Sequence, residues 1–325
     1  MLFYFSAAIF IISLLSFYIY ISVGKKLNFY DKNNFFVIKS KILTGSGIVF
    51  YILTFVFLII MCKSTAIQFP NKIWPLVLSI SVLVLVSFYD DFKPVNPIIK
   101  LFFQLLFVYL SLASINLYAL NIPLKVAVFF VVIGWVYTIN IINFIDGADG
   151  FLAIFSISFF LILFMASEKY SLSFLNAISI TLLPILISFL IFNKPDAKLY
   201  MGDSGSIFLG YTIGYTSIEL VVNGYWFITI TLLSYPICDC SLTLIKKVLK
   251  GNLPWARMFD YFFLMPIKKN YFLKKNVFYI MILSCSVNTI IAFCQIIFDI
   301  KYLFILSLVV NFFTIWKYYN LGKKT

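Results

Sequence analysis

The chain has 325 residues, of which 63% are hydrophobic and only 11% charged, and its mean hydropathy is +1.04. Soluble globular domains do not have this balance, so the composition predicts a polytopic membrane protein. The formal net charge of +13 comes from lysines between apolar runs, which is typical of membrane topology and anionic lipid rather than of nucleic acid. Histidine is absent, which excludes histidine-ligated metals and imidazole acid–base catalysis.

Eleven apolar runs follow one another along the chain, and most have the length that a helix needs to cross hydrocarbon. The expected spans are Met1–Val23, Gly47–Met61, Ile73–Tyr89, Leu101–Tyr118, Pro123–Ile142, Phe151–Ala166, Leu172–Phe192, Ser206–Val222, Tyr225–Ile245, Val277–Phe298 and Tyr302–Tyr318. We therefore expect an all-α membrane protein with a single transmembrane domain over 1–325. Ten spans remain the alternative if two runs merge.

The distribution of basic residues predicts the topology. The first run has no basic residue before it and is followed by Lys25 and Lys26, which is typical of an uncleaved span rather than a signal peptide. With eleven spans, twenty of the 25 Lys and Arg fall on one side of the membrane and five on the other. The positive-inside rule makes the richer side cytoplasmic, with the N-terminus outside and the C-terminus in the cytoplasm.

Acidic residues gather on the same side, although the positive-inside rule gives them little weight. Nine of the 12 acids lie on or near the cytoplasmic side: Asp31, Asp90, Asp91, Asp146, Asp149, Asp196, Asp203, Asp239 and Asp260. A shared site on the cytoplasmic face is the simplest cause of this clustering.

The most unusual segment is Ile139 to Leu152, which reads I-N-I-I-N-F-I-D-G-A-D-G-F-L between two apolar runs. A carboxylate near hydrocarbon costs about 2.5–3.5 kcal/mol on insertion scales, so Asp146 and Asp149 need a reason to be there. Their spacing places both on one face if the segment is helical. The segment is either a short polar connection or a cation or phosphate site at the membrane edge.

A second segment ends the third span and reads S-F-Y-D-D-F-K-P-V-N-P-I-I-K up to Lys100. The adjacent carboxylates of Asp90 and Asp91 repel each other, and a divalent cation would relieve that repulsion. A solvated helix end flanked by lysines is the alternative.

Two further cytoplasmic segments carry phosphate-binding chemistry. The run Met201–Ser206 offers the Asp203 carboxylate, hydroxyls and backbone N–H groups at the start of a helix, where anions are favoured. A capped turn is the alternative. In the long loop from Lys246 to Lys275, the basic residues Lys246, Lys247, Lys250 and Arg257 could contact diphosphate or lipid headgroups, or form an ordinary positive-inside loop.

Taken together and in this order, the segments resemble the polyprenyl-phosphate N-acetylhexosamine-1-phosphate transferases, a superfamily that starts O-antigen and teichoic-acid chains and includes the peptidoglycan translocase. The resemblance runs from about Asp31 to Phe263. The family's aspartate pair matches Asp90–Asp91, its N-x-x-N-x-x-D-G-x-D-G motif matches Asn140 through Gly150, and its M-G-D-x-G-S motif matches Met201 to Ser206. A degenerate form of the early D-x-P-N…G-G segment appears at Asp31, Asn34 and Thr44 to Gly47.

The chain departs from the family in its last long cytoplasmic loop, where relatives carry a histidine-bearing motif and the translocase a histidine triplet. Arg257 and Asp260 fall near those positions. The departure favours the O-antigen-initiating type over the translocase and leaves the donor contacts of this loop open.

The resemblance implies transfer of a sugar-1-phosphate from a UDP-sugar to a polyprenyl phosphate such as undecaprenyl phosphate, releasing UMP. It implies a multi-pass protein of the inner (plasma) membrane with its active site on the cytoplasmic face. The expected cofactor is Mg²⁺, with Mn²⁺ as the alternative ion, held by Asp203 with Asn143 as a neutral ligand. A homodimer stays open.

The same resemblance assigns the remaining roles. Asp90 and Asp91 are the expected groups that orient or deprotonate the lipid phosphate, with Asp90 preferred as the base, and Asp149 completes the catalytic set. The predicted substrate-binding residues are Asn143, Asp146, Tyr200 (stacking on uracil), Lys100, Lys246, Lys247 and Arg257.

Two other classes of function compete with this interpretation. A carboxylate-based transporter would place its acids near the bilayer midplane and often shows repeat symmetry, whereas here the acids lie at span ends and no repeat is visible. A family member that binds lipid or nucleotide without turnover is suggested by the missing histidines.

Overall fold

The structure is a bundle of long α-helices. The computed structural model describes residues 2–31, 42–65, 70, 72–251 and 261–324. Its helices are α1 (Leu2–Leu27), α2 (Gly47–Thr65), α3 (Ile73–Asp90), α4 (Pro97–Ser111), α5 (Leu124–Ile145), α6 (Phe151–Lys169), α7 (Ser173–Asn193), α8 (Gly202–Val222), α9 (Trp226–Leu249), α10 (Leu264–Lys269), α11 (Lys274–Phe298) and α12 (Phe304–Lys324). Short 3₁₀ turns are η1 (Leu112–Ser114), η2 (Leu117–Leu120), η3 (Tyr271–Leu273) and η4 (Lys301–Leu303).

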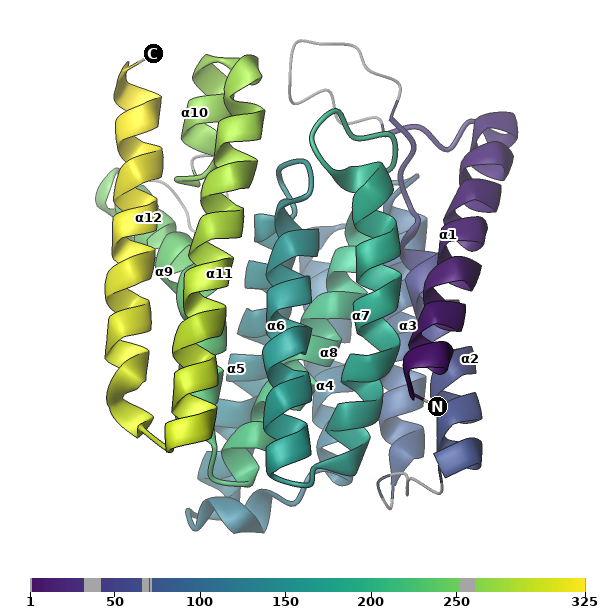
Figure 1. Ribbon diagram of the computed structural model, residues 1–325, viewed down its shortest axis with the longest axis vertical. Coiled ribbons are helices and arrows are strands. Elements are labelled where there is room, and N and C mark those ends of the chain that lie inside the picture. The colour runs from purple at the N-terminus through teal and green to yellow at the C-terminus, as the bar shows by residue number, and fades with distance from the viewer. Residues whose placement is uncertain (1, 32–41, 66–69, 71, 252–260, 325) are drawn as a thin grey trace.

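Eleven helices in the described part of the chain are long and apolar enough to cross a membrane. The chain is therefore an all-α, multi-pass membrane protein, as predicted. α1 begins in the lower half of the view and α12 ends at the top of the bundle (Figure 1). Which end faces the cytoplasm stays a prediction.

Most expected spans match the observed helices, and the largest difference concerns the fourth. The run expected over Leu101–Tyr118 forms a helix only from Pro97 to Ser111 and then continues as 3₁₀ turns. The earlier start has a local cause, because the Asn96 side chain accepts a hydrogen bond from the Ile98 N–H (2.9 Å) and proline occupies the first helical position.

The outer surface of the bundle is apolar, which suits contact with lipid tails. Side chains such as Ile19, Leu78, Phe102, Phe129 and Leu283 are each more than half exposed. In a bilayer these positions face hydrocarbon, so their exposure costs nothing there.

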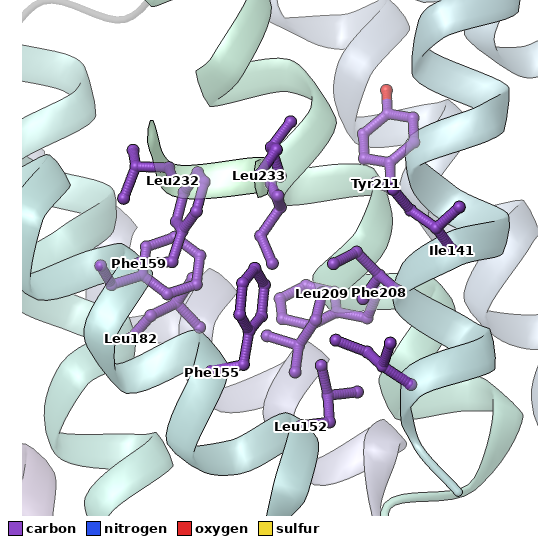
Figure 2. Close-up of a cluster of buried hydrophobic side chains, with 14 of the residues drawn as sticks. Ile141, Leu152, Phe155, Phe159, Leu182, Phe208, Leu209, Tyr211, Leu232 and Leu233 are labelled. Carbon is purple, nitrogen blue, oxygen red and sulfur yellow. The ribbon is translucent and has the colours of Figure 1, made fainter. Parts of the chain in front are cut away.

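The central helix is α8, which packs against α2, α3, α5 and α9 and is the most buried span (Figure 1). Its close packing depends on glycine. A Cβ at Gly214 would lie 2.2 Å from Cδ1 of Trp135 on α5, and one at Gly210 would lie 2.9 Å from the Cα of Ile139. Beside α8, side chains of α6, α8 and α9 such as Phe155, Leu209 and Leu233 point toward one another (Figure 2). The first turn of α8, with Asp203, is thus held by a packed core.

Candidate active site

The start of α8 is capped by a carboxylate from the end of α3. Asp91 accepts hydrogen bonds from the Asp203 N–H (2.6 Å), the Ser204 hydroxyl (2.7 Å) and the Ser204 N–H (3.3 Å). The first N–H groups of a helix have no partner within it, so Asp91 satisfies them and complements the helix dipole. Gly202, with φ +74°, leaves room, since a Cβ there would lie 2.6 Å from the Asp91 carboxyl oxygens.

Burial and the neighbouring Asp203 carboxylate raise the pKa of Asp91 to about 8, while the hydrogen bonds from Ser204 and the Asp203 N–H act in the opposite direction. The two adjacent aspartates therefore differ in surroundings. Asp91 is used in holding α8, and Asp90 faces a lysine.

Lys100, near the start of α4, bridges two carboxylates that are far apart in the sequence. Its Nζ lies 2.6 Å from Oδ2 of Asp90 and 3.0 Å from Oδ2 of Asp203. Asp90 also accepts a hydrogen bond from the Val95 N–H (2.6 Å) and is 8% exposed, whereas the Asp203 side chain is 36% exposed. One ammonium thus partly neutralises two carboxylates, of which Asp203 is the more accessible.

Asn143, near the end of α5, completes this group. Its Nδ2 donates to Oδ1 of Asp203 (3.3 Å) and to the Ser206 hydroxyl (2.7 Å). Within the described residues no hydrogen bond uses the Asn143 Oδ1, so this oxygen remains a candidate ligand. One turn earlier, Asn140 donates to Oε1 of Gln104 (2.7 Å), which ties α5 to α4.

Asp146 lies in the turn that follows α5. Burial raises its pKa well above the usual value for a carboxyl, and the nearby Asp203 and Asp91 carboxylates raise it further. Its backbone N–H donates to the Asn143 carbonyl (3.3 Å), whereas its carboxyl group forms no hydrogen bond or ion pair among the described residues. A half-buried carboxyl with this electrostatic environment is a candidate for binding a cation or a donor group.

The donor set near Asp203 suits a hard cation. Carboxylate and amide oxygens of Asp203, Asn143 and Asp146 are the ligand types that Mg²⁺ takes, and Mg²⁺ keeps several sites for water and phosphate oxygens. In the described part of the chain no three or more His, Cys, Asp or Glu side chains are grouped closely enough to hold a metal by themselves. The residues therefore fit a Mg²⁺ that shares its coordination with a substrate.

Asp149 belongs to a second cluster, with the loop between α7 and α8. It accepts hydrogen bonds from the N–H groups of Asp196 (3.2 Å) and Ala197 (3.3 Å) and from the Tyr200 hydroxyl (3.2 Å). Nζ of Lys274, at the start of α11, lies 3.6 Å from Asp149 and 2.8 Å from Asp196. This lysine holds the pKa of Asp196 below its usual value.

The backbone of Tyr200 is held by two hydrogen bonds to the segment that precedes α2. Its N–H donates to the Leu43 carbonyl (2.8 Å), and its carbonyl accepts from the Ser46 hydroxyl (3.0 Å). Burial and the Asp149 carboxylate raise the pKa of the Tyr200 phenol, which therefore stays protonated as a donor to Asp149. The early T-G-S-G segment thus packs directly on the M-G-D-S-G segment.

The structure brings together Asp90, Asp91, Lys100, Asn143 and Asp203, and forms a second group around Asp149 and Tyr200. Among the described residues, no hydrogen bond or ion pair joins Lys246 of the long loop to these groups. Nζ of Lys246 lies over the Phe262 ring at 5.3 Å, Lys247 is buried in α9, and Arg257 lies outside the described residues.

Lys274 and Asn193 were missed by sequence reasoning. Asn193 accepts a hydrogen bond from the Gly150 N–H (3.1 Å) and donates to the Leu199 carbonyl (2.9 Å), so it joins two motifs. The sequence signal for Asn193 is its position in the polar segment F-N-K-P-D, which directly follows an apolar run. Lys274 has no such signal, because it resembles any other lysine at the start of a span.

Part of the chain is similar to a known protein family. Residues 73–221 match the family described as Glycosyl transferase family 4. The matched segment is slightly less than half of the chain. It runs from α3 to α8 and supports the predicted superfamily over the part of the chain that carries the candidate site. The segment contains all six aspartates of the candidate site described above: Asp90, Asp91, Asp146, Asp149, Asp196 and Asp203.

Several curated relatives are similar over the same part of the chain. A protein of Bacillus subtilis (strain 168), named "Probable undecaprenyl-phosphate N-acetylglucosaminyl 1-phosphate transferase", is 32% identical over 123 residues, which is 35% of this chain and 34% of the relative. Phospho-N-acetylmuramoyl-pentapeptide-transferases of Leuconostoc mesenteroides and Streptococcus uberis are each 32% identical, over 34% and 42% of this chain and 34% and 46% of their own length. The chain thus matches less than half of each relative.

Proposed function

We propose that the protein transfers a sugar-1-phosphate, from the N-acetylhexosamine class, from a UDP-sugar to a polyprenyl phosphate. An oxygen of the lipid phosphate attacks the phosphorus that carries the sugar. The bond from that phosphorus to the UMP oxygen breaks, the electron pair leaves with UMP, and a new P–O–P bond joins sugar and lipid. The named activities of the relatives and the match to the family support this reaction class.

The observation that carries the proposal is the group of Lys100, Asp90 and Asp203 at the first turn of α8. Both substrates are anionic, so their approach requires neutralisation before attack. The Lys100 ammonium lies between the two carboxylates and within reach of a phosphate bound beside them. A proton on the lipid phosphate passes to Asp90, whose Oδ2 is already in contact with Lys100.

A Mg²⁺ ion, with Mn²⁺ as the alternative, would be held by Asp203 and Asn143, and when bound it neutralises and polarises the diphosphate. Asp91 keeps Asp203 in place through the α8 N-terminus. Asp146 and the Asp149–Tyr200 pair form the walls proposed for the nucleotide sugar, with the Tyr200 ring against uracil.

The distribution of charge supports a cytoplasmic site in the inner (plasma) membrane. In the topology predicted from the sequence, most lysines fall on the side of the membrane that carries Asp90, Asp146 and Asp203.

The test is incorporation of label from UDP-GlcNAc and related UDP-sugars into lipid, in membranes that carry the wild-type protein, Asp203→Asn or Asp299→Asn. Asp299 follows α11 at the end of that helix away from Lys274, so it controls for the loss of one carboxylate. We expect labelled lipid with the wild type and Asp299→Asn, and a loss of about 10²-fold or more with Asp203→Asn.

Two outcomes would contradict the proposal. Equal product from the wild type and Asp203→Asn would remove the metal assignment. Binding of UMP or lipid without product from any UDP-sugar would favour a non-catalytic family member.

A further inference from the structure

A groove of about 400 Å³ lies between the ends of α9 and α12. It is lined by Lys246 of α9, by Phe262, and by four residues of α12: Phe312, Ile315, Trp316 and Tyr319. None of the candidate-site carboxylates contributes to it. In the view of Figure 1, α9 passes behind α12 at the edge of the bundle that lies away from α1.

The groove combines an apolar wall with one positive charge. Ile315 is only 4% exposed and forms part of the wall, whereas Phe312 and Trp316 are more than half exposed beside it. The Lys246 ammonium lies over the Phe262 ring, and within the described residues no carboxylate pairs with it. Lys247 differs, because it is buried.

The position of the groove along the helices places it at the membrane interface. Lys246 is in the last turn of α9, Trp316 and Tyr319 are in the second half of α12, and both helices are candidate spans. Trp, Tyr and Lys are enriched at the level of lipid headgroups, because each has an apolar body and a polar end. The groove therefore opens at the depth where a headgroup meets its acyl chains.

Phe262, which forms part of the groove wall, is held in place by buried residues. The Phe262 N–H donates to Oδ1 of Asp239 (3.0 Å), a fully buried carboxylate of α9. Next to it, the Phe263 ring stacks on Phe151 with centroids 4.4 Å apart. The groove is therefore a built feature of the packed chain and not a chance gap between surface side chains.

We propose that this groove binds one anionic glycerophospholipid. Its phosphate lies at the Lys246 ammonium, and the start of an acyl chain lies along Phe312, Ile315 and Trp316. Charge complementarity supports this occupant, because the cation has no protein counter-ion among the described residues and anionic lipid is attracted to basic positions near the surface. A polyprenyl phosphate held here would gain the same contact, but it would face none of the carboxylates at the start of α8.

The test compares lipid binding by native mass spectrometry. The purified, delipidated protein is titrated with phosphatidylglycerol or phosphatidylcholine. We expect the first phosphatidylglycerol to bind about tenfold tighter than phosphatidylcholine, and Lys246→Gln to weaken it about fivefold. Lys317→Gln is the matched control, because Lys317 lies next to Trp316 but points its Nζ over Phe313 at 5.6 Å and does not line the groove.

Further variants separate binding from folding. Lys246→Arg keeps the charge and should keep the affinity, and Trp316→Ala should weaken phosphatidylglycerol about threefold through lost apolar contact. Equal losses in Lys246→Gln and Lys317→Gln would overturn the proposal, because they would indicate diffuse attraction. Equal binding of the two phospholipids, or displacement of phosphatidylglycerol by an equimolar polyprenyl phosphate, would overturn the proposed occupant.

Discussion

Nζ of Lys100 lies 3.0 Å from Oδ2 of Asp203, although 103 residues separate them in the sequence. The same ammonium contacts Asp90 at 2.6 Å. The candidate site is thus held by a cation that the protein itself supplies, and a substrate phosphate or a metal ion must share or replace these contacts. This relationship determines what each neighbouring substitution should do.

Lys100→Met should abolish most of the transferase activity. Removing the ammonium leaves Asp90 and Asp203 without their shared counter-charge and removes a donor for the substrate phosphates, so we expect a fall of about 10²-fold in kcat. Initial rates of lipid labelling measure this effect. Lys93→Gln is the control, since the Lys93 ammonium lies over the Tyr89 ring at 5.8 Å and pairs with no carboxylate among the described residues. A Lys100→Met rate within threefold of the wild type would contradict the role.

Asp91→Ala should lower the stability of the fold more than Asp90→Ala does. It removes the acceptor for the Asp203 and Ser204 N–H groups at the start of α8, and loss of a helix cap costs about 1–2 kcal/mol. Thermal unfolding in detergent should therefore show a lower Tm for Asp91→Ala than for Asp90→Ala. Equal Tm values would argue against the capping role of Asp91.

Lys274→Met should weaken donor binding. Lys274 holds Asp149 and Asp196, and Asp149 in turn holds the Tyr200 hydroxyl. We expect the KM for the UDP-sugar to rise about tenfold with little change in the KM for the lipid. Lys275→Met is the control, because Lys275 pairs with Asp196 alone, at 3.4 Å, and is 60% exposed. An equal rise of the KM in both variants would indicate that the effect comes from the ion pairs with Asp196 at the surface and not from the Asp149 contact.

The affinity for Mg²⁺ should rise with pH. The pKa of Asp91 is raised to about 8, so a substantial fraction of this carboxyl is protonated below that pH, and the pKa of Asp146 is raised as well. A cation near Asp203 favours the deprotonated forms, so its binding releases protons and weakens as the pH falls, by up to about tenfold per pH unit for each proton released. Mg²⁺-dependent shifts of Tm between about pH 6 and about pH 8 measure this trend. An affinity independent of pH would contradict it.

Gly47→Ala should prevent correct folding. A Cβ at Gly47 would lie 1.9 Å from the backbone N of Gly205 on α8, and neither backbone can move away without breaking its helix. Gly134→Ala on α5 is the control, because a Cβ there meets nothing within 4 Å. Yield of monodisperse protein and its Tm distinguish the two. A normal Gly47→Ala protein would contradict the close contact of α2 and α8.

The sequence predicts the spans well because hydrocarbon thickness sets the helix length and few charges interrupt the runs. It also predicts that Asp90, Asp146 and Asp203 share one face, because the loops alternate between two sides. It does not separate the roles of Asp90 and Asp91, since that difference arises where Asp91 meets the α8 N-terminus. The Lys274 contact was equally hidden, because α11 lies far along the chain and only tertiary packing brings it to Asp149.

The glycine contacts of α8 restrict how the candidate site can move. Gly205 of α8 lies against Gly47 of α2, and Gly210 and Gly214 lie against Ile139 and Trp135 of α5. Because these contacts leave no space, α8 can neither slide nor rotate without steric collision. The backbone of Asp203, in the first turn of α8, is therefore held in a fixed position. Adjustment during a catalytic cycle is left to longer side chains such as Lys100, which can exchange one oxygen partner for another without any movement of the helices.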